Sequence, residues 1–182
     1  MSTDTELDPP AAAPKPYAYR TRPFPHQRKA FAETANLPGY GLLWEQGCGK
    51  TKPLIDTTAY LYQEKKISAL LVVAPNGVHR NWITDEIPTH MPEDVYKQCK
   101  FLIWKSSSFG TKKAQAYRKE VMFWGGLSVV VVAYEATITD NFKDWIKKFV
   151  KERETIIVLD ESHRIKTAKS HVKTTLVALG KW

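Results

Sequence analysis

The chain has 182 residues, of which 43% are hydrophobic and 25% charged, values typical of a globular protein with one core. Its two cysteines exclude a disulfide framework and a cysteine-built zinc site. The sequence contains neither an apolar run of about 18 residues nor a signal-peptide pattern. We therefore expect a cytoplasmic protein without a membrane partner, from a prokaryotic or viral host rather than a secreted one.

The charge is unevenly distributed along the chain. The first sixteen residues carry Asp4, Glu6 and Asp8 against one base, Lys15, so removing them raises the formal net charge from +8 to +10. Four prolines and an alanine triplet in this segment leave little apolar surface to bury. We expect a disordered arm over residues 1–16 and one basic domain over 17–182. Its charge favours a polyanion such as nucleic acid, although it could equally serve solubility.

Short apolar runs alternate with polar stretches of helix length, a pattern typical of a parallel sheet covered by helices. We expect strands at about 41–45, 69–74, 100–104, 127–133 and 155–160. We expect helices near 49–64, 77–87, 111–123, 139–152 and 168–179. The apolar runs at 129–132 and 156–159 are continuous, which indicates strands covered on both faces. The predicted fold is α/β, with a mainly parallel sheet and helices on both of its faces.

A phosphate-binding loop is predicted between the first of these strands and the following helix. Gly47 and Gly49 let backbone N–H groups converge on phosphate oxygens, and the following helix adds the positive end of its dipole. Lys50 would reach the β- and γ-phosphates, and the Thr51 hydroxyl would bind Mg²⁺. Trp44 stands where the usual pattern has its first glycine. The residues assigned to nucleotide binding are Glu45, Gln46, Gly47, Cys48, Gly49, Lys50 and Thr51.

Two carboxylates lie at the C-terminal end of the last predicted strand, where α/β folds bind their ligands. Asp160 could hold the Mg²⁺ shell, and Glu161 could orient and deprotonate the attacking water. The pair could instead begin a turn or cap a helix. The phosphate loop about 110 residues upstream favours the catalytic interpretation.

The segment Asp160-Glu161-Ser162-His163 resembles the Asp-Glu-x-His signature, or DEAH box, of superfamily 2 helicases. Its continuation, Arg164-Ile165-Lys166 with Ser170, is similar to Swi/Snf-type DNA translocases. Upstream segments resemble further motifs of the family in the same order: Pro25-His26-Gln27, the phosphate loop, 70–75 with Asn81, Trp82 and Glu86, and 130–135. Three departures are Ser162 for alanine, Thr167 for asparagine, and Gln46-Gly47-Cys48 for a Met-Gly-Leu type of loop. None removes a group that the chemistry requires.

The resemblance implies the first RecA-like lobe of an ATP hydrolase that uses Mg²⁺ and tracks double-stranded DNA without sequence preference. Gln27 would read the adenine edge, and His163 would couple the ATP site to nucleic acid. The residues implied to contact DNA are Pro75, Asn76, Arg80, Tyr134 and Glu135. Plainer alternatives stay open: a surface position for Gln27, a solvated charge for Arg80 and a packed ring for Tyr134. Trp82 is expected in the core.

The family's Thr-Gly-Thr strand and its second RecA-like lobe, which supplies arginines to the ATP site, have no counterpart in the sequence. We therefore expect weak or no ATP hydrolysis by this chain alone, because an arginine finger contributes about 10³ to 10⁵ in rate in related systems. A non-catalytic, nucleotide-dependent module that binds DNA or protein is the first alternative. A small-molecule kinase is the second, and it would not carry Asp-Glu-x-His.

Overall fold

The computed structural model describes residues 14–162 and residue 174. Most of the predicted arm, the predicted coupling residue His163 and most of the helix predicted near 168–179 lie outside these residues. Lys15, at the end of the predicted arm, forms an ion pair with Glu64 at 2.5 Å. The boundary between arm and domain at residue 17 stays a prediction.

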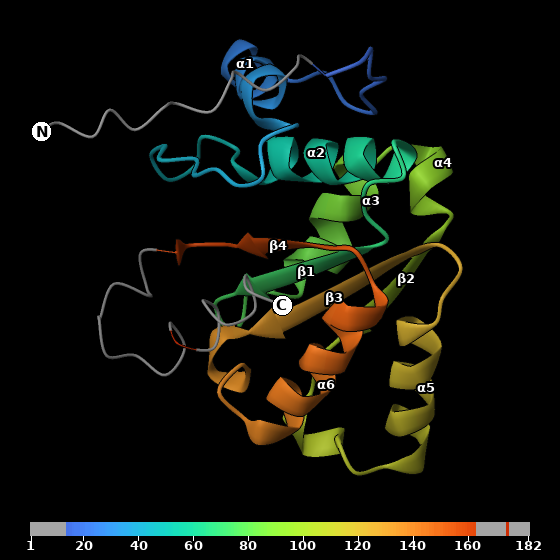
Figure 1. Cartoon of the computed structure of the whole chain (residues 1–182). Helices are drawn as coiled ribbons and strands as arrows, with labels where there is room; N and C mark the ends of the chain where they lie inside the picture. The colour runs from blue at the N-terminus through green and yellow to red at the C-terminus, as the bar shows by residue number, and fades with distance from the viewer. Residues whose placement is uncertain (1–13, 163–173, 175–182) are drawn as a thin grey trace, which may run out of the picture.

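Within residues 14–162, four parallel strands form one sheet in the order β2-β3-β1-β4 (Figure 1). They are β1 (Ala69–Ala74), β2 (Cys99–Ile103), β3 (Leu127–Ala133) and β4 (Thr155–Leu159). Val73 of β1 is in register with Val132 of β3 and Leu159 of β4. All six residues of β1 are buried, and so are residues 129–132 of β3, which confirms the covering on both faces expected there. The same expectation for 156–159 is wrong: in β4, the last strand of the described sheet, Val158 is buried but Leu159 is exposed.

Helices cover both faces of the sheet, which confirms the predicted arrangement (Figure 1). One face packs against α2 (Thr51–Gln63), the π-helical turn η1 (Trp82–Glu86), α3 (Ile87–His90) and α4 (Glu93–Tyr96). The other packs against α5 (Lys112–Met122) and α6 (Asp140–Glu152). Alternate residues of β1 pack into the hydrophobic cores on the two faces of the sheet: Leu70 faces α2, and Leu71 faces α6.

Helix α1 (Pro25–Thr34) was not predicted from the sequence. It packs on α2 through Phe31 and Ala35, which meet Tyr60 in a small cluster. Its start has two recognisable signals: Pro25 occupies the first helical position, and the Gln27 side chain accepts a hydrogen bond from Phe24 N at 2.8 Å. The short 3₁₀ turns η2 (Ser106–Ser108) and η3 (Tyr134–Ala136) complete the described elements.

The strand predicted at 41–45 is wrong. These residues form no strand, and the Leu43 side chain is 95% exposed. The run Gly41-Leu42-Leu43 contains no β-branched residue and follows a second glycine at position 39, so its preference for extended pairing is weak.

The helix predicted over 77–87 is shorter and later than expected. A turn occupies residues 76–80, and the helical segment starts at Trp82 as η1 and continues as α3 to His90. Its end is explained by Pro92, which disfavours helical geometry at the preceding residue, and Met91 is accordingly extended.

Candidate nucleotide site

The start of α2 and the carboxyl ends of β1 and β4 lie at the same end of the domain (Figure 1). Parallel strands bring their carboxyl ends to one edge, where α/β folds bind ligands. Asp160 follows β4 and continues its pairing, because its backbone N–H donates to Val73 O at 2.9 Å. The predicted phosphate loop and acidic motif therefore belong to the same end of the sheet.

Two buried aromatic residues from other elements hold Asp160. Trp82 Nε1 donates to Asp160 Oδ2 at 3.0 Å, and the Tyr134 hydroxyl donates to Asp160 O at 2.7 Å. Trp82 is 2% exposed and belongs to the core, which confirms the core position expected for it. The Trp82 bond orients one carboxylate oxygen, so the Asp160 side chain is held in place rather than rotating freely.

Glu161 adopts a left-handed backbone conformation, with φ of 52°. A residue with a Cβ rarely occupies this region, and such strain concentrates at functional sites.

The phosphate loop contains two glycines in the left-handed region, Gly47 with φ of 83° and Gly49 with φ of 68°. Glycine adopts this conformation without the steric cost that a Cβ imposes. At Gly49 space is also short, because a Cβ there would lie 2.5 Å from Gln27 Nε2. The positive φ therefore favours glycine at position 49, and a Cβ there would also force the Gln27 amide to move.

Lys50 ends the loop, and its ammonium group donates to the carbonyls of Trp44 at 2.7 Å and Glu45 at 3.1 Å. The side chain thus turns back across the loop. Carbonyls are neutral acceptors, whereas phosphate oxygens form stronger, charge-assisted bonds with an ammonium group. Thr51 is the first residue of α2, where backbone N–H groups and the helix dipole favour an anion.

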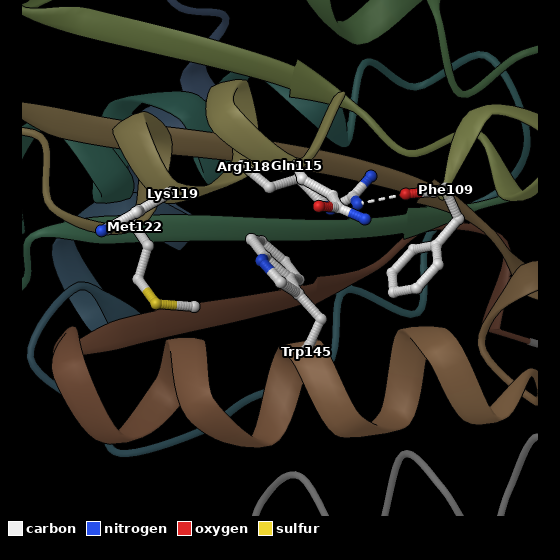
Figure 2. Close-up of a pocket in the computed structure, with 6 residues that line it drawn as sticks. All are labelled: Phe109, Gln115, Arg118, Lys119, Met122 and Trp145. Carbon is white, nitrogen blue, oxygen red and sulfur yellow. Dashed lines mark hydrogen bonds between the residues drawn. The ribbon is translucent and has the colours of Figure 1, made fainter. Parts of the chain in front are cut away.

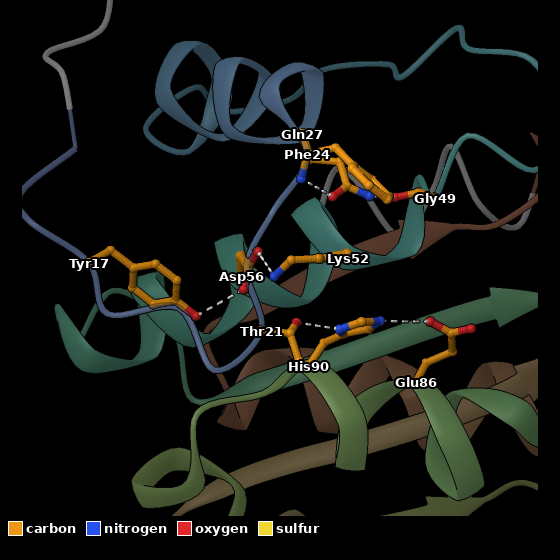
Figure 3. Close-up of polar contacts among 9 residues, drawn as sticks. All are labelled: Tyr17, Thr21, Phe24, Gln27, Gly49, Lys52, Asp56, Glu86 and His90. Carbon is orange, nitrogen blue, oxygen red and sulfur yellow. Dashed lines mark hydrogen bonds and ion pairs between the residues drawn. The ribbon is translucent and has the colours of Figure 1, made fainter.

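Gln27 joins α1 to the phosphate loop (Figure 3). It is 4% exposed, and its Nε2 donates to Gly49 O at 2.9 Å while its Oε1 accepts from Phe24 N. A glutamine amide has two N–H donors and two acceptor lone pairs, so half of this capacity remains. The adenine contact expected of Gln27 stays a prediction.

Sequence reasoning missed His26, which lies directly at the loop. Its Nε2 is 3.0 Å from Cys48 O, and its ring meets Trp44 edge to face at 4.9 Å. The signal available was its position beside the glutamine already assigned to the nucleotide.

A buried ion pair secures the first turn of α2, and it too was missed. Lys52 Nζ lies 2.9 Å from Asp56 Oδ2, and the Tyr17 hydroxyl donates to Asp56 Oδ1 at 3.2 Å (Figure 3). Burial raises the pKa of Asp56 above its ordinary value, and Lys52 and Tyr17 oppose that rise. The Tyr17 bond to Asp56 therefore attaches the N-terminal segment to α2.

A second polar group lies beneath the acidic motif. Thr21 Oγ1 is 2.7 Å from His90 Nδ1, and His90 Nε2 is 3.8 Å from Glu86 Oε2 (Figure 3). Burial raises the pKa of Glu86, as do the charges of Asp160 and Asp85. Burial lowers the pKa of His90, with Lys52 contributing. The surroundings of Glu86 thus disfavour the ionised form of its side chain.

The residues expected to contact DNA follow β1 and β3. Asn76, Arg80 and Glu135 are exposed, whereas Pro75 and Tyr134 are buried. Tyr134 agrees with the packed-ring alternative, because its hydroxyl bonds the main chain at Asp160. The DNA contacts of all five stay predictions.

Among the described residues, no three histidine, cysteine or acidic side chains gather in a metal-binding cluster. The oxygens of Thr51 and Asp160, the two residues predicted to bind Mg²⁺, suit that ion, which is usually bound by one or two protein oxygens together with phosphates and water. In the part of the chain that the structure describes, no helix has the length and apolar character to cross a membrane.

A hollow of about 270 Å³ lies between α5 and α6, on the sheet face opposite α2 (Figure 2). Its lining is Phe109, Gln115, Arg118, Lys119, Met122 and Trp145. The Arg118 guanidinium lies 4.2 Å from the Phe109 ring centroid and donates to Phe109 O, so it is engaged in packing. This hollow is separate from the phosphate loop.

Comparison with known proteins places these features in a family context. The family model described as the SNF2-related domain matches residues 33–181. The ISWI chromatin-remodeling complex ATPase CHR17 of Arabidopsis thaliana is 30% identical over 133 residues, covering 72% of this chain and 11% of that protein. Nuclear protein STH1/NPS1 of Saccharomyces cerevisiae is 29% identical over 137 residues, covering 72% and 9%. The chain thus spans about a tenth of these relatives, which give no support to the expected prokaryotic or viral host.

A solved structure, the Sulfolobus solfataricus SWI2/SNF2 ATPase core in complex with dsDNA, matches with a TM-score of 0.54 and 18% identity. The match covers 90% of this chain and 37% of that chain. It confirms the predicted α/β, RecA-like fold.

Proposed function

Because the chain belongs to the SNF2-related domain family, we propose that it is the first lobe of an ATP-driven translocase on double-stranded DNA. It would bind Mg²⁺ and ATP at the loop from Glu45 to Thr51 and would contact DNA along the carboxyl edge of its sheet. The observation that carries the proposal is the common placement of this loop and Asp160 at one end of the domain.

The loop would bind the triphosphate through backbone N–H groups that the left-handed glycines turn inward. Lys50 would exchange its bonds to the Trp44 and Glu45 carbonyls for bonds to phosphate oxygens. Thr51 and Asp160 would hold Mg²⁺, which neutralises charge on the phosphates when it is bound. Trp82 would keep Asp160 in the orientation for this role.

Glu161 would orient the attacking water and accept its proton. Phosphoryl transfer depends mainly on positioning and charge neutralisation. Arginines from a second RecA-like lobe would complete that neutralisation. We therefore expect this chain by itself to bind ATP and to hydrolyse it slowly or not at all.

DNA binding is proposed at the exposed polar residues after β1 and β3, above all Arg80, whose guanidinium can pair with phosphate bidentately. Phosphate contacts carry little sequence information, so binding should be insensitive to sequence and strongly weakened by salt. The dsDNA named with the Sulfolobus structure supports the choice of duplex over single strands.

The proposal is tested by ATP turnover with and without duplex DNA, for this chain and for a longer protein that joins it to a second lobe. We expect DNA to stimulate hydrolysis by the longer protein. Failure of DNA to stimulate that protein, with Lys50 and Glu161 intact, would refute the translocase. ATP and DNA binding without turnover would favour the non-catalytic module.

A further inference from the structure

Arg118 is a buried cation whose charge has no acidic partner among residues 14–162. It is 6% exposed, and the ion pairs of this part of the chain join other residues. Its guanidinium donates to Phe109 O, and a guanidinium has five N–H donors. Burial lowers its pKa, but an arginine stays protonated at neutral pH. Because buried charges are normally paired, this one indicates a missing anion.

The aromatic rings beside Arg118 compensate its charge only in part. The guanidinium lies 4.2 Å from the Phe109 ring centroid and 5.4 Å from that of Trp104. A ring face attracts a cation, so these contacts account for the position of the side chain. They do not replace a carboxylate, which accepts two parallel hydrogen bonds from a guanidinium and carries a full negative charge.

The hollow between α5 and α6 gives an anion access to this guanidinium. Figure 2 shows Arg118 next to Gln115, which lies one helical turn earlier on α5. The apolar part of the lining consists of Phe109, Met122 and Trp145. The volume of about 270 Å³ is far larger than a single water molecule needs. A ligand that fits this lining has an anionic group for Arg118 and an apolar group for the rings.

The surface of α5 around the hollow is positively charged. The helix carries four basic residues against one acid, Glu120, and that acid pairs with Lys100 of β2. Lys119, one of the four, is exposed and lines the hollow. This unbalanced charge attracts an acidic partner.

A segment of polypeptide suits the hollow better than duplex DNA or a small molecule. A guanidinium that is 6% exposed is out of reach for the phosphates of a wide double helix, whereas a single side chain can enter. Phe123 directly follows the lining residue Met122 and is 61% exposed, so the apolar surface continues past the hollow. An occupant longer than one side chain would cover both parts.

We propose that this hollow docks a segment of a partner protein in which a carboxylate stands beside an apolar side chain. The carboxylate would pair with Arg118, and the apolar side chain would pack against Met122 and Trp145. The inference goes beyond the proposed function, because the hollow lies on the sheet face opposite α2 and its occupant does not depend on ATP.

The test measures binding of a blocked peptide, two phenylalanines flanked by glutamates, to the whole chain by fluorescence anisotropy of a dye on the peptide. Arg118→Gln should weaken binding by roughly ten- to 100-fold, the loss expected when a hydrogen bond between charged groups is removed. Gln115→Glu leaves the buried side chains intact and places a carboxylate of the chain's own one helical turn from the guanidinium. It should abolish peptide binding and raise the midpoint of urea unfolding.

Arg28→Gln is the matched control, since Arg28 is exposed on α1 and the charge change is the same. It should bind the peptide like the unmodified chain. A peptide with serine in place of phenylalanine should bind weakly, because it cannot pack against the apolar lining.

The proposal is overturned if the unmodified chain does not bind the phenylalanine peptide, if Gln115→Glu binds it equally well, or if the serine peptide binds as tightly. Duplex DNA that binds with the same dependence on Arg118 would assign the hollow to nucleic acid instead. Self-association that Arg118→Gln abolishes would assign it to a second copy of this chain. Either of these results would also overturn the proposal.

Discussion

The buried ion pair between Lys52 and Asp56 allows a quantitative test of the structure around the phosphate loop. Lys52→Met keeps a long, mainly apolar side chain but removes the ammonium group. The Asp56 side chain is 1% exposed, and in the variant its carboxylate keeps the hydrogen bond from the Tyr17 hydroxyl, 39 positions upstream. The variant therefore leaves a buried carboxylate without its positively charged partner.

Removal of one partner from a buried ion pair lowers the free energy of unfolding by about 3–5 kcal/mol. We expect a loss near the lower end, about 3 kcal/mol, because Tyr17 still donates to Asp56 and the acid can take up a proton. Domains are stable by only about 5–15 kcal/mol, so this loss is easily measured by urea unfolding followed by tryptophan fluorescence. Replacing both residues, as Lys52→Met with Asp56→Leu, should cost less than the single change.

Lys29→Met provides the matched control. Lys29 and Glu33 have the same i,i+4 spacing, but their side chains are 75% and 61% exposed and their charged atoms are 3.8 Å apart. An exposed pair of this kind contributes less than about 0.5 kcal/mol. If Lys52→Met lost no more stability than Lys29→Met, the pair at α2 would not be buried and the described attachment of the N-terminal segment would be wrong.

Two further predictions concern the loop and the acidic motif. Gly49→Ala should weaken ATP binding more than Gly47→Ala, because both positions have positive φ but only at Gly49 would the added Cβ collide with Gln27. Nucleotide titration of the two variants measures this difference. Equal losses of affinity would contradict the close contact between Gly49 and Gln27. The raised pKa of Glu86 means that its contribution to stability is fully present below its ordinary pKa and is lost as the pH rises through the folded-state value. Glu86→Gln should therefore match the unmodified chain at low pH and exceed it in stability at pH 7, as measured by urea unfolding at each pH. Equal stability at both pH values would contradict the raised pKa of Glu86, which burial causes first and the charges of Asp160 and Asp85 increase.

The strands with continuous apolar sequence were predictable from the sequence. Burial on both faces selects valine, leucine and isoleucine at successive positions, and the predicted bounds of β1 and β3 agree with the structure. The segment 41–45 shows the limit of this reasoning, because a short apolar run with glycine can be mistaken for a strand when its pairing partner is unknown.

The motifs of the candidate site were visible in the sequence because a phosphate-binding loop is recognised by local spacing, here from Glu45 to Thr51. The residues that hold these motifs in place could not be identified from the sequence. Asp56 is bonded by Tyr17 from 39 positions away, and Asp160 by Trp82 from 78 positions away. Such contacts depend on how the elements pack, and no local pattern records them.

We propose that this loop binds Mg²⁺ and ATP, with separate roles for Lys50 and Glu161. The most direct measurement is titration of ATP, with Mg²⁺ present, against the unmodified chain, Lys50→Ala and Glu161→Gln. We predict that the unmodified chain and Glu161→Gln bind ATP with similar affinity, whereas Lys50→Ala does not bind it. Equal loss of binding in both variants, or full binding by Lys50→Ala, would contradict the assigned roles.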